Sequence, residues 1–249
     1  MASIKDLTKQ AGMVFEGAVR RMDETASVSG NEGRKTAVVE VVKILKGPPV
    51  LARYTGREVS VQLHRPVELR PNFRAVFFTT GVSFGEGLIL RELGQEEERP
   101  GLEREVEEAV QQSNDDKIFN RLSQAELVVA GTCIETRPFE DAKSAKKPVS
   151  EHDPEWWVCL IEVSSIEKGK GKTEKGKAAT EIVTLFAHST DIVWYRSPKF
   201  HKGVSGIWLL HRRDHLGKPV PALVTDHPLD FHPLTQLDHV RALLKREPE

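Results

Sequence analysis

The chain has 249 residues, of which 39% are hydrophobic and 29% are charged, and its formal net charge at pH 7 is −1. This balance is typical of a folded globular protein and excludes a disordered chain, while the small net charge argues against a general binder of polyanions. No apolar run approaches the roughly 18–20 residues that span a bilayer, so the sequence predicts neither a transmembrane helix nor a membrane partner.

The N-terminus, MASIKDLTKQ, lacks the basic and then apolar pattern that marks a secretory signal. The chain has two cysteines, Cys133 and Cys159, which are too few for the disulfide framework of a small secreted domain. Together these features favour a reducing, cytoplasmic setting, unless a signal segment has been removed.

The first hundred residues predict a short helix followed by five strands. Apolar residues at helical spacing indicate a helix over 4–11, and a strand that contains Gly17 follows it. The next strand, VVEVVKILK, is nearly all apolar and ends at Lys46 and Gly47, where strand residues are no longer favoured. The remaining strands of this half are predicted at 57–63, 75–78 and 88–90.

The segment 101–116 follows with the sequence GLEREVEEAVQQS at its start. Leu102, Val106 and Val110 recur every four residues among acidic side chains, which predicts an amphipathic linker helix. Its apolar face would pack against a barrel or, in the alternative interpretation, dock a partner.

The second half repeats the elements of the first half in the same order. A helix over 118–125 precedes a strand interrupted by Gly131, and the strand CLIEVSSIEK then ends at Lys168 and Gly169. Further strands are predicted at 180–186 and 206–210. Because four matches occur in one order, the sequence indicates a tandem duplication.

The expected fold is therefore mainly β, with two tandem five-stranded barrels of the oligonucleotide/oligosaccharide-binding (OB) type, an amphipathic linker helix and a C-terminal helix. Gly17 and Gly131 are expected where the first strand of each barrel bends. The C-terminal helix, within PLTQLDHVRALLKR, is expected to cover the open side of the second barrel. The predicted domains are 1–100 for the first barrel, 101–116 for the linker helix, and 117–249 for the second barrel with its C-terminal helix.

This order of elements resembles the OB-type barrel of tissue inhibitors of metalloproteinases and of netrin-like modules. The matching segments are 15–17, 39–47, 59–63 and 73–78 in the first half, and Gly131, 161–169, 182–186 and 203–210 in the second. The resemblance implies a fold and a tendency to bind other proteins. It does not imply protease inhibition, because those inhibitors use a disulfide-bonded N-terminal cysteine and this chain begins Met1-Ala2-Ser3.

Few residues suggest chemistry. Five histidines occur late in the chain, near three aspartates: His211, His215, His227, His232 and His239, with Asp214, Asp226 and Asp230. The spacing of His211 and His215 suits a metal only on a helix, whereas their context predicts a turn and solvated side chains. Cys133 and Cys159 are expected to be small buried side chains, with a redox role as the alternative. No catalytic residue, metal site or cofactor is predicted, and metal-dependent catalysis by the late histidines is a minor alternative.

Single-stranded nucleic acid is the alternative ligand. The sequence KGKGKTEKGK carries five lysines, which with the nearby Trp194 could hold phosphates and stack a base: Lys168, Lys170, Lys172, Lys175 and Lys177. A solvated loop with Trp194 partly buried is the simpler interpretation.

The leading hypothesis is a non-enzymatic protein-binding or scaffold module. Aromatic side chains in or beside loops and strand ends are costly to leave in water unless a partner covers them. The expected docking residues are Trp156, Trp157, Trp194, Tyr195, Arg196 and Phe200, with Phe84 as a further aromatic of this kind. Coverage by helices of the same chain is the alternative.

Overall fold

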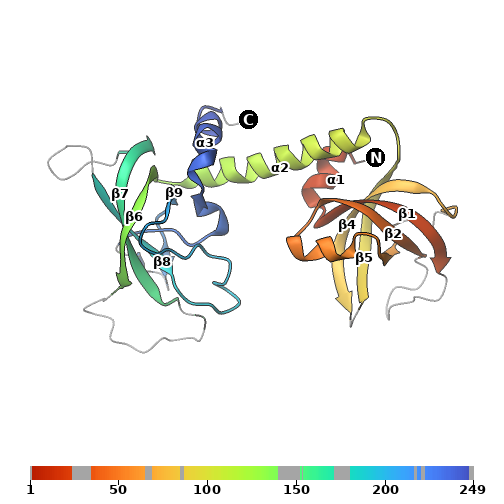
Figure 1. Ribbon diagram of the computed structural model, residues 1–249, viewed down its shortest axis with the longest axis horizontal. Coiled ribbons are helices and arrows are strands. Elements are labelled where there is room, and N and C mark those ends of the chain that lie inside the picture. The colour runs from red at the N-terminus through yellow and green to blue at the C-terminus, as the bar shows by residue number, and fades with distance from the viewer. Residues whose placement is uncertain are drawn as a thin grey trace. The chain divides into compact units, whose positions relative to one another are not determined.

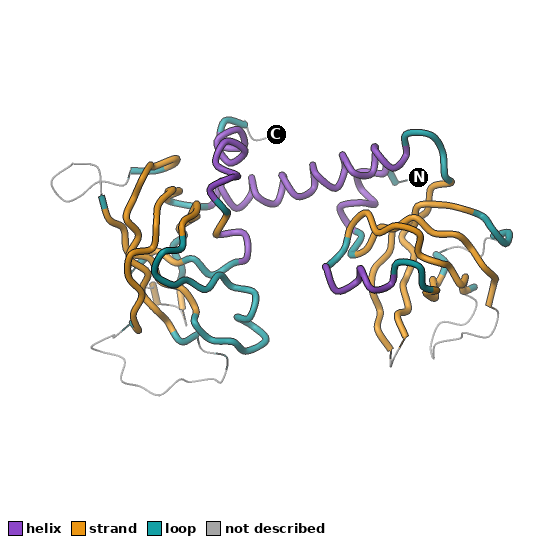
Figure 2. The backbone as a smooth tube through the Cα atoms, in the orientation of Figure 1, coloured by secondary structure: helices purple, strands orange, loops and turns teal. Residues whose placement is uncertain are grey.

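The computed structural model describes residues 2–23, 35–64, 69–84, 87–139, 152, 154–170, 180–215, 218–219 and 222–246. Contacts divide the chain into two compact units, Met1–Asp115 (unit 1) and Asp116–Glu249 (unit 2). The division falls within the segment that the sequence assigns to a linker helix. Strands predominate in both units, as Figure 2 shows.

Unit 1 contains a closed barrel of five strands in the order β1-β2-β3-β5-β4 (Figure 1). β3 runs parallel to β5, and every other neighbouring pair is antiparallel. The elements are α1 (Ile4–Gln10), β1 (Met13–Asp23), β2 (Thr36–Lys46), the 3-10 helix η1 (Pro49–Tyr54), β3 (Glu58–Gln62), β4 (Arg74–Phe84) and β5 (Gly87–Glu97). The sequence-based expectation of five strands and a closed barrel is confirmed for this unit.

The core of unit 1 comes from alternate residues of the barrel strands, which point inward. Phe15 on β1 stacks against Phe77 on β4, with ring centroids 5.4 Å apart. Val39, Val61 and Leu90 complete the interior, and all of them are fully buried. The inward residues are largely β-branched or aromatic, the types that suit a half-buried strand.

Unit 2 is built on an open six-stranded sheet, in the order β12-β8-β7-β6-β9-β13. The expectation of a second closed barrel is therefore wrong. Its strands are β6 (Leu127–Pro138), β7 (Trp156–Lys168), β8 (Glu181–Ala187), β9 (Ser205–Leu210), β12 (Leu223–Val224) and β13 (Phe231–His232), beside a separate pair, β10 (Asp214–His215) and β11 (Lys218–Pro219). The helical elements are η2 (Pro228–Asp230), η3 (Leu234–Gln236) and α3 (Leu237–Leu244).

The barrel of unit 2 is open because the segment that would be its fifth strand is broken. β12 pairs parallel with β8, as β5 pairs with β3 in unit 1, and β13 pairs antiparallel with β9, as β5 pairs with β4. Between these two pieces the chain turns through η2, which begins at Pro228. Proline has no backbone N–H to donate to a sheet, so one continuous strand cannot form here.

The first two strands of each unit carry the same irregularities. In β1 the pairing with β2 shifts between Glu16 and Gly17, and in β6 the pairing with β7 shifts between Ala130 and Gly131. The other shifts also occur at matching places, between Val14 and Phe15 and between Val19 and Arg21 in β1, and between Val128 and Val129 and between Cys133 and Glu135 in β6. The two strand pairs therefore bend in the same way.

A lysine at the end of the second strand binds the preceding helix in each unit. In unit 1 the Nζ of Lys46 donates to the carbonyl oxygens of Thr8 and Ala11, at 2.6 and 2.8 Å. In unit 2 the Nζ of Lys168 donates to those of Leu122 and Ser123, at 2.7 and 2.8 Å. The last carbonyls of a helix have no intrahelical donor, so each ammonium caps a helix C-terminus.

The linker helix is longer than the sequence indicates. α2 runs without a break over Leu102–Gln124, so the two expected helices, over 101–116 and 118–125, are one. Leu102 and Val106 are buried within unit 1, and Leu122 is buried within unit 2. No helix in the described ranges is both long enough and apolar enough to cross a membrane.

The C-terminal helix forms as expected but covers a different surface. Val240 and Leu243 of α3 pack against Ala130 of β6 and Ile207 of β9, which point away from the aromatic interior of the sheet. The helix therefore covers the outer face of these strands and not the open side of the barrel.

We expect Gly17→Val to destabilise unit 1 by roughly 1–3 kcal/mol. A Cβ at Gly17 would lie 2.4 Å from Cγ1 of Val39 and 3.2 Å from the carbonyl oxygen of Glu40. The close approach of β2, and not the backbone conformation, requires glycine here, since Gly17 has no positive φ. Gly81→Val in β4 is the matched control, since nothing lies within 4 Å of its Cβ position. The measurement is the free energy of unfolding in urea. An equal loss of this free energy in Gly17→Val and Gly81→Val would contradict the role of the close approach.

We expect Lys168→Met to destabilise unit 2 by roughly 1–2 kcal/mol, because it removes two charged hydrogen bonds and leaves helix carbonyls without a donor. Lys46→Met should have the same effect on unit 1. Lys170→Met is the control, because Lys170 is exposed beyond the end of the strand. Thermal unfolding of the variants measures the difference, and equal midpoints for Lys168→Met and Lys170→Met would contradict the capping role.

Candidate functional site

The most distinctive surface of unit 2 is a turn over 191–197, in the connection between β8 and β9. The carbonyl oxygen of Asp191 accepts hydrogen bonds from the backbone N–H groups of Trp194 and Tyr195, at 3.1 and 2.8 Å. Its Oδ1 accepts from the N–H of Val193 at 2.8 Å. One aspartate thus satisfies three consecutive backbone donors, which fixes the conformation of the turn.

Trp194 anchors this turn. Its side chain is only 6% exposed, and Nε1 donates to the carbonyl oxygen of His152 at 2.8 Å. Its ring meets Trp156 edge-on, with centroids 6.0 Å apart, and the guanidinium of Arg213 lies 4.9 Å from its centroid. Trp194 is therefore a buried anchor, and it forms no exposed patch with Tyr195.

Two further side chains bind the turn to its surroundings. The Nζ of Lys199 donates to the carbonyl oxygens of Ala187, at the end of β8, and of Trp194. Ser197 donates through Oγ to the carbonyl oxygen of Asp226 at 2.6 Å. Burial lowers the pKa of Lys199, and the charge of Asp191 opposes that shift. These contacts give the turn a defined position on the sheet.

Three large apolar side chains project from this fixed turn into solvent. Ile192 is 80% exposed, Val193 54% and Tyr195 61%. We call these three residues the apolar turn. Arg196 is exposed beside them. Because the backbone below is held by hydrogen bonds and by Trp194, the apolar turn cannot easily withdraw its side chains from water.

A buried charge network lies in the same unit and is centred on Asp230, which is fully buried. Arg121 of α2 donates to it from Nε and Nη2, at 2.6 and 2.9 Å, and the backbone N–H groups of Asp226 and His227 donate at 3.0 and 2.9 Å. Nε2 of His211 lies 3.1 Å from Oδ1 of Asp230. Burial alone would raise the pKa of Asp230, but these contacts with His211, Arg121 and His227 hold it below its usual range.

The network extends to the anchor of the turn through Asp226. This carboxylate pairs with Arg213, whose guanidinium lies over Trp194, and it also lies 3.6 Å from Arg121. Burial lowers the pKa of His227, and the charge of Arg121 lowers it further. The arrangement joins α2, the broken fifth strand and the turn over 191–197.

The prediction of solvated late histidines is met only in part, since His227 is exposed whereas two others are buried. His211 and His232 are each 6% exposed, and the Nδ1 of His227 accepts a hydrogen bond from the N–H of Leu229. His239 lies on α3, and the side chains of Asp214 and His215 lie outside the described part. Within the described residues, no group of three His, Cys, Asp or Glu side chains is placed to hold a metal ion.

The lysines predicted to bind nucleic acid do not form one described surface. Lys168 caps α2, and burial lowers its pKa. Lys170 is exposed, whereas Lys172, Lys175 and Lys177 lie outside the described residues.

The expected docking residues are only partly exposed. Trp156 and Trp157 are half-buried, and Trp157 stacks on His188 with ring centroids 4.2 Å apart. Phe200 is 6% exposed, and it packs against Phe186 and Trp208. Phe200 and Trp194 are thus covered within the chain, but by residues of strands and loops and not by the helices of the alternative interpretation. The side chain of Phe84 lies outside the described part.

Sequence reasoning missed Ile192 and Val193. The available signal was the run DIVWYR, in which four apolar side chains follow one another in a short loop between polar residues. A tight turn cannot bury all four of these side chains. The docking prediction rests on the aromatic members of this run and on Arg196, and so leaves out the two aliphatic residues.

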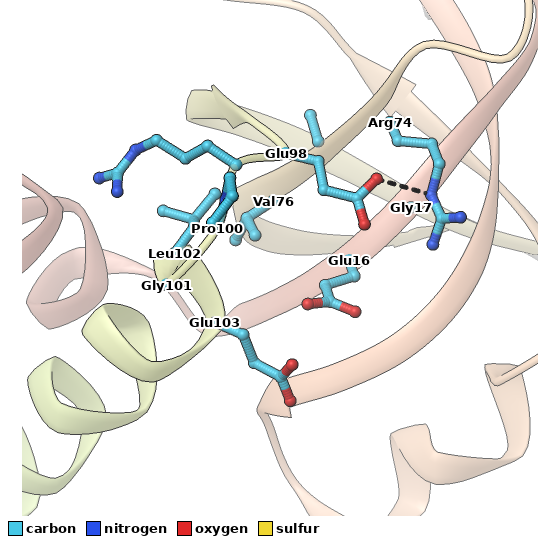
Figure 3. Close-up of a pocket in the computed structure, with 11 residues that line it drawn as sticks. Glu16, Gly17, Arg74, Val76, Glu98, Pro100, Gly101, Leu102 and Glu103 are labelled. Carbon is cyan, nitrogen blue, oxygen red and sulfur yellow. Dashed lines mark ion pairs between the residues drawn. The ribbon is translucent and has the colours of Figure 1, made fainter.

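Unit 1 contains a pocket of about 500 Å³ between β1, β4 and the turn from β5 into α2. Figure 3 shows the carboxylates of Glu16, Glu98 and Glu103 around it, with Glu98 paired to Arg74 at 2.9 Å. Glu103 pairs with Lys43. These two acidic groups are thus neutralised within the unit.

Glu16 is the exception, since no hydrogen bond or ion pair joins its carboxylate to another described residue. Partial burial raises the pKa of Glu16, and the neighbouring charge of Glu103 raises it further.

Comparison with known proteins assigns no family to this chain. No protein-family model matches it, and no curated protein matches it. The chain aligns with a solved structure described as "Structural mimicry for functional antagonism" at 15% identity, over 87% of this chain and 91% of that one, with a TM-score of 0.25. A TM-score this low supports no conclusion about fold or function.

We expect Asp230→Asn to destabilise unit 2 by about 3–5 kcal/mol at neutral pH, because it leaves Arg121 and His211 without their buried carboxylate. The pKa of Asp230 is lower in the folded protein than its ordinary value of 3.8. Its ionised form therefore stabilises the fold above that pH, and this contribution is lost as the pH falls through the lower folded value.

The measurement is the unfolding midpoint from neutral pH down to about pH 2. The wild-type advantage over Asp230→Asn should shrink on acidification. Asp238→Asn is the control, because that carboxylate is fully exposed on α3. A constant difference between wild type and Asp230→Asn across the range would contradict the assignment.

Proposed function

We propose that the protein is a non-enzymatic protein-binding or scaffold module, and that the apolar turn of unit 2 is its docking surface. The exposure of Ile192, Val193 and Tyr195 on one rigid turn carries this proposal. Large apolar side chains that stay in water usually mark an interaction site, and an anchored turn loses little conformational freedom on binding.

The surroundings of the turn indicate the chemistry of the partner. Arg196 and Lys202 are exposed on the same connection between β8 and β9. A complementary surface would hold an apolar pocket for Tyr195 and Ile192, with acidic groups at its rim. The partner that fits is thus a folded protein with such a pocket.

We further propose that the two units are copies of one OB-type barrel. The strand order of unit 1 is that of a five-stranded barrel with a parallel pairing of the third and fifth strands. The matching register shifts at Gly17 and Gly131 and the capping lysines Lys46 and Lys168 support a common origin. The resemblance to the metalloproteinase inhibitors and netrin-like modules stays a prediction.

The Asp230–His211 pair supports this non-enzymatic proposal. Its carboxylate is fully buried, it receives two hydrogen bonds from Arg121, and it receives two from the backbone. Asp230 thus binds α2 to the broken fifth strand through all of these contacts. The contacts are those of a structural ion pair.

The test compares a triple variant, I192S/V193S/Y195S, with Val50→Ser, whose side chain in unit 1 is as exposed as that of Tyr195. Proteins that co-purify with the chain from its native cells are quantified for wild type and both variants. We expect a specific partner to be retained by wild type and Val50→Ser and to be lost at least tenfold from the triple variant. Thermal midpoints should stay equal, because the replaced side chains are exposed.

Two outcomes would contradict the proposal. If the triple variant retained every co-purifying protein as well as wild type does, the apolar turn would not be the docking surface. Tight, salt-tolerant binding of single-stranded DNA or RNA would favour the alternative function through the lysine-rich segment, since phosphate contacts alone weaken steeply with salt. Trp194→Ala does not serve as the docking variant, because loss of a buried anchor should lower the thermal midpoint.

A further inference from the structure

The two cysteines of the chain meet in the core of unit 2. Cys133 on β6 and Cys159 on β7 are free thiols, both are fully buried, and their sulfur atoms lie 3.0 Å apart. They are the only two cysteines among 249 residues. A disulfide bond is about 2.05 Å long, so a shift of about 1 Å would bring these sulfur atoms to bonding distance.

Packing alone does not require thiols at these positions. In unit 1 the matching positions in the strand pairing are occupied by Val19, opposite Val39, and by Ala37, opposite Met22. In unit 2, Cys133 is opposite Ile161 and Cys159 is opposite Thr136. Val19 and Ala37 are fully buried, so ordinary apolar side chains fill the same place in a closed barrel.

The pairing of β6 is irregular at Cys133. The ladder with β9 ends at Thr132, and Cys133 then exchanges two backbone hydrogen bonds, with Val204 and Gly203, both at 2.8 Å. The pairing with β7 shifts directly after Cys133, leaves Ile134 outside the ladder and resumes at Glu135. Such an irregularity is a place where strands can separate locally without unfolding the unit, and a small solute can then reach the thiols.

We propose that Cys133 and Cys159 form a redox modification site, in which a peroxide oxidises the two thiols to a disulfide that joins β6 to β7. One sulfur attacks the peroxide, the O–O bond breaks, and a sulfenic acid and water are formed. The second thiol displaces hydroxide from that sulfur, and its proton leaves with the hydroxide as water. Two thiols and one hydrogen peroxide thus give one disulfide and two waters.

The closed fold keeps this reaction slow. Burial raises the pKa of the Cys159 thiol, and the contact with Cys133 raises it further, so little thiolate is present while the strands are closed. Reaction therefore follows local separation of the strands at Cys133. Once formed, the disulfide would enclose the long connection between β6 and β7, which restricts the unfolded chain and stabilises unit 2.

The experiment treats the reduced full-length protein with hydrogen peroxide in native buffer. The products are mapped as peptides without reduction, and thermal midpoints are recorded before and after treatment. The control is the double variant C133V/C159A, which takes the residue types found at these positions in unit 1 and keeps the three methionines that peroxide also attacks. The wild-type measurements stand alone if this variant does not fold.

We expect one intramolecular linkage between Cys133 and Cys159, with a mass lower by two hydrogen atoms, and reversal by dithiothreitol. The midpoint of unit 2 should rise by about 5–10 °C in the oxidised wild type, with no such rise in the double variant. Thiols that stay reduced in the native protein, while the urea-unfolded chain is oxidised under the same conditions, would overturn the proposal. So would oxidation that ends at sulfinic acid, or a linkage that fails to raise the midpoint.

Discussion

The contact on which each unit depends is the one between a strand-ending lysine and the helix that precedes the first strand. Lys46 and Lys168 each donate to two carbonyl oxygens at a helix C-terminus, where no intrahelical donor exists. Each lysine thereby ties a helix to the second strand, and the first strand lies between the two in sequence. The chain must turn away immediately afterwards, and Gly169 does so with φ of +89° while a Cβ there would lie 2.3 Å from the carbonyl oxygen of Glu126. This requirement explains the glycine after Lys168, whereas Gly47 after Lys46 has no positive φ and no close neighbour that demands glycine.

The two units solve the closure of the sheet by different physical means. In unit 1, backbone hydrogen bonds along β5 close the barrel. In unit 2, Pro228 interrupts that strand, and the buried carboxylate of Asp230 receives four hydrogen bonds in the interruption. Contacts of charged side chains thus stabilise the region of the fifth strand in unit 2, which backbone pairing stabilises in unit 1. The same network reaches Trp194 through Arg213, so the docking surface that we propose is supported by the element that replaces the fifth strand.

Much of the fold follows from local patterns in the sequence, while much of the site does not. Alternating apolar residues located the strands, and Gly17 and Gly131 marked their irregular pairing, because both signals act within a few residues. The opening of the second barrel combines a local signal, Pro228, with the contact between Asp230 and Arg121, which are distant in sequence and which no local pattern joins. The burial of Trp194 depends likewise on His152 and Arg213, which are distant in sequence. The aromatic residues therefore located the turn, where Tyr195 and Arg196 are exposed, but Trp194 is buried and Ile192 and Val193 were missed.

The two units differ at the positions that our proposals concern. In unit 1, Val19 and Ala37 occupy the positions that match Cys133 and Cys159 of unit 2. Apolar side chains are therefore sufficient to fill this part of the core. The connection between β8 and β9 is longer than that between β3 and β4, and the extra length carries Asp191, Trp194 and the apolar turn. Both features lie in unit 2, whose open sheet is held by side-chain contacts. Unit 1 is the closed barrel, and the apolar turn and the cysteine pair that our two proposals concern both lie in unit 2.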